Sequence, residues 1–314
     1  MTGIDPALLT LLDQVESDFP EQSPESRTQQ RARINEMIDR MMVKGSEPAP
    51  AVRSITDYAV PVAGGRIEVR VFTPEADGPL PGHLHIHGGA FWLGSAVGLS
   101  EDIACRERAA GAGVVVVSVE YRMAPEHQFP GPVEDCYAAL EWMHAEHAKL
   151  GIDPSRLSVG GASAGGNLAA AVSLLAAERG GPALRLQLLE VPVLDLTGGH
   201  LDDAGIEPSD ADLPRVRGIY LGDPAQATNR LASPLLADDV TGFPDTHVLT
   251  AEFDVLRGDG EAFVRRLQEA GMPATGHRMA GHLHASPMLT RVFPAARLWR
   301  TEVIERLRKA HVAG

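Results

Sequence analysis

Short apolar segments alternate with longer segments of helical periodicity along most of the chain, and this alternation limits the possible folds most. The run from Val114 to Val119 is almost entirely apolar, as a central strand covered by helices on both faces requires. Repeated strand-then-helix units predict a mostly parallel, doubly wound α/β sheet. The strand segments of this part are 83–88, 114–121, 156–161, 184–191 and 246–253.

The main sheet should be extended at both ends. Two strand segments near its start are joined by Gly64 and Gly65, which predicts a hairpin. A last strand and a terminal helix close the pattern. We expect these four elements at 52–62, 65–74, 274–281 and from about Ala295 to Ala310.

Two segments lie outside the strand and helix alternation. Before residue 45, apolar residues recur every three or four positions, and Gly and Pro then break the pattern. We expect residues 1–45 to be N-terminal cap helices and 46–314 to be the main domain. The stretch from Thr197 to Asp223 is loop-like. At about 197–223 we expect a cap insertion that covers the C-terminal edge of the sheet together with the N-terminal helices.

Composition excludes several classes of function. The formal net charge is −14, which disfavours binding to nucleic acid or to an anionic membrane. No apolar run approaches the roughly 20 residues that span a bilayer. The N-terminus lacks a basic segment followed by an apolar one, so we expect a cytoplasmic protein without a signal peptide. Cys105 and Cys136 lie in separate helical segments and predict buried side chains, not a disulfide.

The strongest local signal is Gly-Ala-Ser-Ala-Gly-Gly at 161–166, which follows a strand segment and opens a helical one. Such a strand-to-helix turn, a nucleophile elbow, holds a serine in a strained conformation at its apex. Only glycine fits easily two residues before and after the serine, and Gly161 and Gly165 hold those places. Ser163 is therefore the candidate nucleophile. The amide of Ala164 would point at the reacting oxygen from the positive end of a helix.

A second signal is His-Gly-Gly-Ala-Phe-Trp at 87–92, directly after another strand segment. Acyl transfer places negative charge on a carbonyl oxygen, and fixed backbone amides stabilise that charge. Glycines let those amides approach without side-chain obstruction. Gly88 and Gly89 would join Ala164 in an oxyanion hole. A tight turn without chemistry is the alternative for this segment taken alone.

An acid and then a base should follow the serine along the chain. Asp254 lies at the end of a strand segment, from which a carboxylate can reach a histidine. Glu252 lies inside that strand, and Asp259 lies at the start of the next helix, where an acid commonly interacts with the helix dipole. The next segment offers three candidate bases: His277, His282 and His284. His282 and His284 would point the same way in an extended segment, so periodicity does not choose between them.

Together these segments resemble the hormone-sensitive-lipase-like family of bacterial esterases, in register from about His85 to His284. HGGAFWLG is similar to the HGGG motif of the family, and GASAGGN to its GDSAGG motif. Between the two, VEYRMAPEHQFPGPVEDCYAAL resembles a long segment that typically begins YRLAPE. AEFDVLRGDG resembles AxxDPLxDEG, and GHLHAS resembles GxxHGF.

The resemblance implies an α/β-hydrolase fold, a mostly parallel sheet flanked by helices with a helical cap. It also implies a serine carboxylesterase that needs no cofactor and no metal and acts on small, short- to medium-chain esters through an acyl-enzyme. Matched residue by residue, the family pattern assigns the catalytic residues as Ser163, Asp254 and His284. It assigns the oxyanion hole to Gly88, Gly89 and Ala164.

The family pattern also chooses among the histidines. A glycine stands three residues before the base, and Gly281 holds that place for His284, whereas Met279 holds it for His282. The segment 285–293 fits a helix start after His284. The sequence departs from the pattern at four places without removing a catalytic side chain: Ala90, Ala162, Val255 and Ala285-Ser286.

Other functions remain to be weighed. A non-catalytic small-molecule binding protein on this fold, such as the plant gibberellin receptors, would lack the family's catalytic histidine, which is present here as His284. An amidase such as an arylformamidase has a similar HGGxW segment, but Trp92 lies one place late for it. A lactone hydrolase would use the same triad. The expected partner is a small-molecule ester, and a homodimer stays open.

Two sets of polar residues have alternative interpretations. His83, His85 and His87 alternate along one strand and share a face, as three metal ligands would. No acid accompanies them at matching spacing, so we expect no metal site, and we expect His83 to begin outside the core. The second set follows the next strand and has two interpretations, contact with the substrate or a buried, hydrogen-bonded support beside the oxyanion segment. We expect the support from these residues: Tyr121, Arg122 and Glu126.

Overall fold

The computed structural model describes residues 3–18, 25–202 and 212–312. Within them, an eight-stranded sheet has the order β1-β2-β4-β3-β5-β6-β7-β8. β2 pairs antiparallel with both β1 and β4, and the later pairs are parallel. The strands are β1 Ser54–Val62, β2 Gly65–Thr73, β3 Leu80–Ile86, β4 Val115–Glu120, β5 Ile152–Ala162, β6 Leu184–Glu190, β7 Asp245–Ala251 and β8 Ala274–Met279. The predicted mostly parallel sheet and its first hairpin are confirmed.

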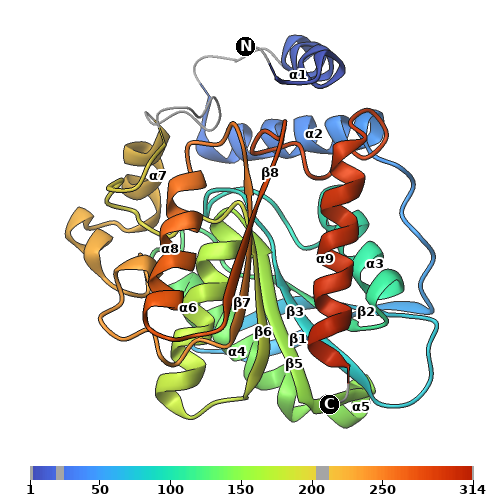
Figure 1. Ribbon diagram of the computed structural model, residues 1–314, viewed down its shortest axis with the longest axis vertical. Coiled ribbons are helices and arrows are strands. Elements are labelled where there is room, and N and C mark those ends of the chain that lie inside the picture. Colours follow the sequence, from blue (N-terminus) through green and yellow to red (C-terminus); the bar gives the residue numbers. More distant parts are fainter. Residues whose placement is uncertain (1–2, 19–24, 203–211, 313–314) are drawn as a thin grey trace.

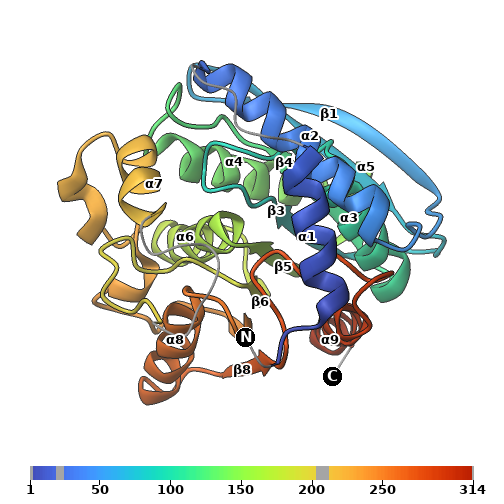
Figure 2. The same ribbon diagram turned by 90° about the horizontal axis from the view of Figure 1, so that it is seen from above.

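Helices cover both faces of the sheet (Figures 1 and 2). Two helices lie against one face: α3 Leu99–Ala112 and α9 Ala295–His311. The other face is covered by α4 Gly131–Ala145, α6 Ala164–Arg179 and α8 Arg257–Glu269, with the short α5 His147–Leu150 after α4. In the part of the chain that the structure describes, no helix is both long and apolar enough to cross a membrane.

β4 shows why the valine run specifies a central strand. Val115, Val117 and Val119 are buried in the main core with residues of α4 and α6. Val114 and Val116 belong to a second buried cluster, which includes Cys105 and Ala109 of α3. Both faces of the strand are therefore covered by helices, as the apolar run predicts.

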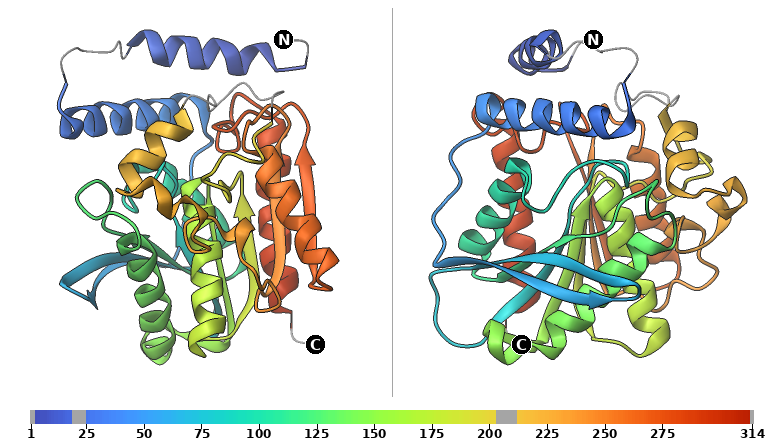
Figure 3. Two further views of the ribbon diagram at one scale, coloured as in Figure 1. Left: turned by 90° about the vertical axis from the view of Figure 1, so that its left-hand side faces the viewer. Right: turned by 180° about the vertical axis from the view of Figure 1, so that it is seen from behind.

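Two N-terminal helices, α1 Pro6–Asp18 and α2 Arg27–Gly45, run across one end of the sheet (Figure 3). Ser26 caps α2 in a capping box with Gln29. The apolar side of α1 packs on the segment before α9. This buried cluster includes Ile4, Leu8, Leu11, Val15, Met42, Leu283, Leu289 and Phe293.

Two predictions about irregular segments are wrong. In the expected loop between Thr197 and Asp223, residues 203–211 lie outside the described part, but Asp212–Tyr220 form helix α7. It is followed by two 3-10 turns, η1 Pro224–Thr228 and η2 Pro234–Leu236. The expected helix start at 285–293 is a series of turns instead. Its backbone is tied to the end of α2, because Gly45 O accepts hydrogen bonds from Arg291 N at 2.8 Å and from Val292 N at 3.3 Å.

Candidate active site

The turn from β5 into α6 places Ser163 at its apex with φ 56° and ψ −118°, a strained conformation for a residue with a side chain. The flanking glycines make this turn sterically feasible. A Cβ on Gly165 would lie 2.0 Å from Ile86 O, and one on Gly161 would lie 2.4 Å from the same oxygen. The predicted elbow is therefore present, with both glycines where close approach demands them.

A hydrogen-bonded chain joins Ser163, His284 and Asp254. His284 Nε2 lies 3.0 Å from Ser163 Oγ, and His284 Nδ1 lies 2.7 Å from Asp254 Oδ2. Asp254 is fully buried, while the His284 side chain is 19% exposed. Asp254 Oδ1 also accepts a hydrogen bond from Leu256 N at 2.8 Å, which orients the carboxylate. The structure thus brings together the three residues that the family pattern selects.

The two other candidate acids bind backbone amides. Glu252 Oε2 accepts a hydrogen bond from Gly281 N at 2.7 Å. Asp259 Oδ2 accepts hydrogen bonds from Leu194 N and Asp195 N at 2.7 and 2.9 Å. Burial raises the pKa of Asp259 to about 7. Both acids therefore hold loops around the site, which the sequence did not reveal.

The two other candidate bases also have separate surroundings. His282 is buried, with Nδ1 2.8 Å from Ser286 Oγ and its ring near Phe293 and Trp299. Burial lowers the pKa of His282 to about 4. His277 lies on the edge strand β8, and its Nδ1 lies 2.6 Å from a Glu302 oxygen. His282 and His284 point in different directions because their segment is a turn and not an extended strand.

The segment after β3 lies against the elbow. A Cβ on Gly88 would be 2.9 Å from Ala162 O and 3.6 Å from Ser163 Cβ. Gly89 has φ 112°, and a Cβ there would lie 2.2 Å from Leu93 O. The next two residues, Ala90 and Phe91, also have positive φ values, of 51° and 66°. This conformation places the glycines expected to form the oxyanion hole beside the serine.

Helix α2 holds that segment from above. Arg31 Nε donates to Trp92 O at 2.7 Å, and its Nη2 donates to Ala124 O at 2.9 Å. Gly94 N donates to Asn35 Oδ1 at 3.1 Å. The amphipathic pattern of α2 gave no indication of these contacts, because they depend on polar residues outside the apolar stripe.

The alternating histidines of β3 have separate partners. Each is buried, so the expectation that His83 begins outside the core is wrong. His83 Nδ1 lies 3.0 Å from Ser158 Oγ, and His85 Nε2 lies 2.7 Å from Glu101 Oε2. The His87 ring stacks on Tyr121 at 4.3 Å between centroids. Among the described residues, no group of three or more His, Cys, Asp or Glu side chains could hold a metal ion.

The expected support around Tyr121 is only partly as predicted. Tyr121 is buried, and its hydroxyl donates to His87 O at 3.2 Å. Arg122 instead pairs with the buried Asp135 at 2.6 Å. Glu126 is half exposed and pairs with Arg31 of α2 at 2.8 Å. Only Tyr121 therefore supports the glycine segment from within the core.

Cys105 and Cys136 are buried and free, as expected.

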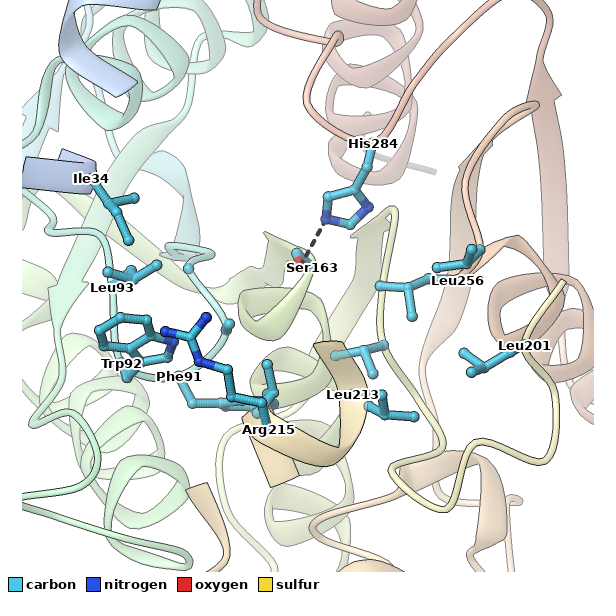
Figure 4. A pocket seen from close by; sticks show the side chains of 15 residues that line it. Ile34, Phe91, Trp92, Leu93, Ser163, Leu201, Leu213, Arg215, Leu256 and His284 are labelled. Carbon is cyan, nitrogen blue, oxygen red and sulfur yellow. Dashed lines mark hydrogen bonds between the residues drawn. The ribbon is translucent and has the colours of Figure 1, made fainter. Parts of the chain in front are cut away.

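An apolar cavity of about 360 Å³ opens over Ser163 and His284 (Figure 4). It is walled by the glycine segment, by α2, by α7 and by the start of α8. No sequence motif assigned side chains of α2 or α7 to this cavity, although the spacing of Leu213 and Val216 could have indicated a helix face. The lining residues beyond the glycine segment include Ile34, Val193, Leu201, Leu213, Arg215, Val216, Val255 and Leu256.

Known proteins resemble this chain in sequence and in fold. A family model described as alpha/beta hydrolase fold matches residues 83–288. An arylesterase of Saccharolobus solfataricus is 35% identical over 266 residues, which cover 81% of this chain and 82% of that protein. Esterase LipI of Mycobacterium tuberculosis is 33% identical over 308 residues, covering 94% of this chain and 91% of that protein. The solved structure of a hyperthermophilic esterase from the archaeon Pyrobaculum calidifontis has a TM-score of 0.89 at 31% identity, covering 99% of this chain and 100% of that chain.

Fold, site and relatives define an α/β-hydrolase of the esterase class. The chain belongs to the α/β-hydrolase family, and its resemblance to the hormone-sensitive-lipase-like esterases is confirmed. It is an enzyme, a carboxylic ester hydrolase.

Proposed function

We propose that the protein hydrolyses small, short- to medium-chain carboxylic esters through an acyl-enzyme on Ser163. The observation that carries this proposal is the chain of hydrogen bonds from Ser163 through His284 to Asp254, at the wall of an apolar cavity. The cavity volume of about 360 Å³ suits a small ester.

In the proposed reaction, Ser163 Oγ attacks the ester carbonyl while His284 Nε2 takes its proton. The tetrahedral oxyanion is stabilised by the backbone amides of Gly88, Gly89 and Ala164. His284 then gives the proton to the leaving alcohol, and the acyl group stays on Ser163. A water molecule, activated by His284, releases the acid. Asp254, buried and hydrogen-bonded to Nδ1, orients the imidazole and stabilises its charged form.

Residues 1–45 and the insertion at about 197–223 form the proposed cap over this site. Ile34 of α2 and Leu213 and Val216 of α7 line the same cavity as Ser163, which supports this assignment. Since their apolar surfaces face the cavity, the cap excludes water from the ester and limits the size of the acyl or alcohol group.

A panel of nitrophenyl esters of rising acyl length, run beside the matching anilide, tests the proposal. We expect hydrolysis of the acetate to hexanoate esters, a decline for longer chains, and much slower cleavage of the anilide. Ser163→Ala should abolish every one of these activities. Faster turnover of the anilide than of the ester would favour an amidase. A folded protein without activity on any ester would contradict the proposal.

A further inference from the structure

The cavity over Ser163 holds one charge that the proposed chemistry does not use. Among the described residues that line it, the polar side chains are those of Ser163, His284 and Arg215. Arg215 comes from α7 and extends towards Trp92 on the opposite side of the cavity from Leu256 (Figure 4). A few polar groups in a largely apolar wall fix the orientation of a ligand, and Arg215 is the one of these three that the proposed reaction leaves unused.

Arg215 is held by an aromatic ring and not by an acid. Its guanidinium carbon lies over the Trp92 ring, 5.5 Å from the centroid, and Trp92 is itself buried. Within the described ranges, no carboxylate lies within ion-pair distance of Arg215. A cation held on the face of a tryptophan keeps its N–H donors at the ring edge available.

Other arginines near the site differ in this respect. Each is paired with a carboxylate: Arg31 with Glu126, Arg122 with Asp135, and Arg257 with Asp202. In these ion pairs the positive charge of the arginine is balanced by a carboxylate, and the pair holds a loop in place. Arg215 therefore stands out among them as a cation facing the cavity without an ion pair among the described residues.

We propose that Arg215 binds an anionic group of the substrate, so that the enzyme prefers esters that carry a carboxylate remote from the scissile bond. This inference rests on the proposed esterase function of Ser163. The guanidinium would hold the carboxylate through two N–H donors. The intervening methylene chain would lie against the apolar wall that α7 contributes through Leu213 and Val216.

Two substrate pairs test this inference and distinguish the two ends of the ester. Monoethyl glutarate against ethyl pentanoate places the charge on the acyl side, and 4-acetoxybutanoate against butyl acetate places it on the alcohol side. Hydrolysis is followed in a pH-stat for the wild type, Arg215→Gln and Arg217→Gln. Arg217 lies two residues further along α7, about 200° around the helix, and does not line the cavity.

For Arg215→Gln, we expect kcat/KM to fall about tenfold for at least one anionic ester, mainly through KM, because a charge-assisted hydrogen bond is lost. The neutral esters should change by no more than about twofold. Arg217→Gln should behave as the wild type on both pairs. Added salt should weaken the preference of the wild type for the anionic ester, and Arg215→Lys should retain part of it.

Equal changes for neutral and anionic esters in Arg215→Gln would overturn the inference, since Arg215 would then act only as a steric wall. The same holds if Arg217→Gln reproduces the effect, because general surface charge would then be the cause. If the wild type hydrolyses neither the neutral nor the anionic esters, the proposed function itself fails.

Discussion

The segment around Ser163 and the segment around His284 position these two side chains in different ways. At the elbow, the two glycines that flank Ser163 in the sequence let the turn pack closely on β3, because a Cβ on Gly161 or Gly165 would lie only 2.4 Å or 2.0 Å from Ile86 O. His284 lies instead among irregular turns between β8 and α9. Its loop is held by groups far away in the sequence, such as Glu252, which accepts the hydrogen bond of Gly281 N.

The N-terminal helices are among the distant segments that contact the loop around His284. Leu11 of α1 and Leu289 meet at Gly45, where a Cβ would lie 2.8 Å from Leu11 Cδ2 and 2.6 Å from Leu289 Cδ2. The last turn of α2 thus packs directly on the loop that follows His284. The proposed nucleophile is therefore positioned by a turn of adjacent residues that packs on β3, whereas the proposed base is positioned by contacts from several distant segments.

The largest expected effect separates the two histidines of that loop. His284→Ala should lower kcat by a factor on the order of 10⁵, as Ser163→Ala should, because the triad acts as a unit. His282→Ala should keep activity within about tenfold while losing about 2 kcal/mol of stability, since it removes a buried hydrogen bond to Ser286. Kinetics on folded, purified variants decide. An inactive His282→Ala beside an active His284→Ala would refute the assignment of the base.

A pair of glycine substitutions tests whether the turn at Ser163 is more constrained than the loop around His284. Gly165→Ala should destabilise the protein by more than about 4 kcal/mol, because the new Cβ would collide with backbone that cannot move away. Gly281→Ala should cost about 1 kcal/mol, since its φ of 76° is unfavourable but its nearest neighbour lies at 3.6 Å. Urea denaturation measures both. Equal losses would show that the elbow is no more constrained than the histidine loop.

Asp259 connects the two regions and should make stability depend on pH. It lies in α8, shortly after Asp254, and holds the backbone of Leu194 and Asp195, which follows the strand beside the elbow. The rise of its pKa from 3.8 to about 7 corresponds to roughly 4 kcal/mol. Because the pKa of this carboxyl is higher in the folded protein than in the unfolded chain, its contribution to the free energy of unfolding is fully present below pH 3.8. This contribution is lost as the pH rises through about 7.

Asp259→Asn should therefore lose less stability than the wild type between about pH 5 and about pH 8. Thermal unfolding at a series of pH values gives the dependence of stability on pH for each protein. Comparing the two slopes removes any pH-independent loss of stability that the substitution itself causes. Parallel curves for the two proteins would mean that Asp259 is ionised throughout this range.

The smallest expected effect concerns the support of the histidine loop by α1. Leu11→Ala removes a buried contact and should cost about 2 kcal/mol of stability. If α1 positions His284, kcat should fall a few-fold even for the smallest ester. Asp13, exposed on the same helix, provides the control Asp13→Ala, which should change neither quantity. A loss confined to large esters in Leu11→Ala would show that α1 shapes the cavity only.

Most of the sheet could be predicted from the sequence because its signals are local. The valine run of β4, the glycine hairpin and the elbow each arise from the chemistry of adjacent residues. Its position at the end of a strand favoured Asp254 among the acids, and the family pattern added the choice of His284, which periodicity could not make. In the structure, Asp254, His284 and Ser163 form one hydrogen-bonded chain.

The features that the sequence did not predict depend on long-range contacts. The segment 285–293 has apolar spacing that fits a helix, but its amides bind the end of α2. His83 is buried because Ser158 and the end of α9 enclose it; His311 Nε2 lies 3.1 Å from the same Ser158 hydroxyl. Arg215 acquires its place in the cavity from the position of α7, which was expected to be a loop.

Covalent labelling tests the central claim most directly. An organophosphonate carrying a reporter group should react with the folded protein in a one-to-one ratio, because only an activated serine attacks it at neutral pH. Peptide mapping by mass spectrometry should place the adduct on Ser163, and His284→Ala should abolish labelling. An adduct on Ser118 or Ser286, or unchanged labelling in Ser163→Ala, would contradict the account.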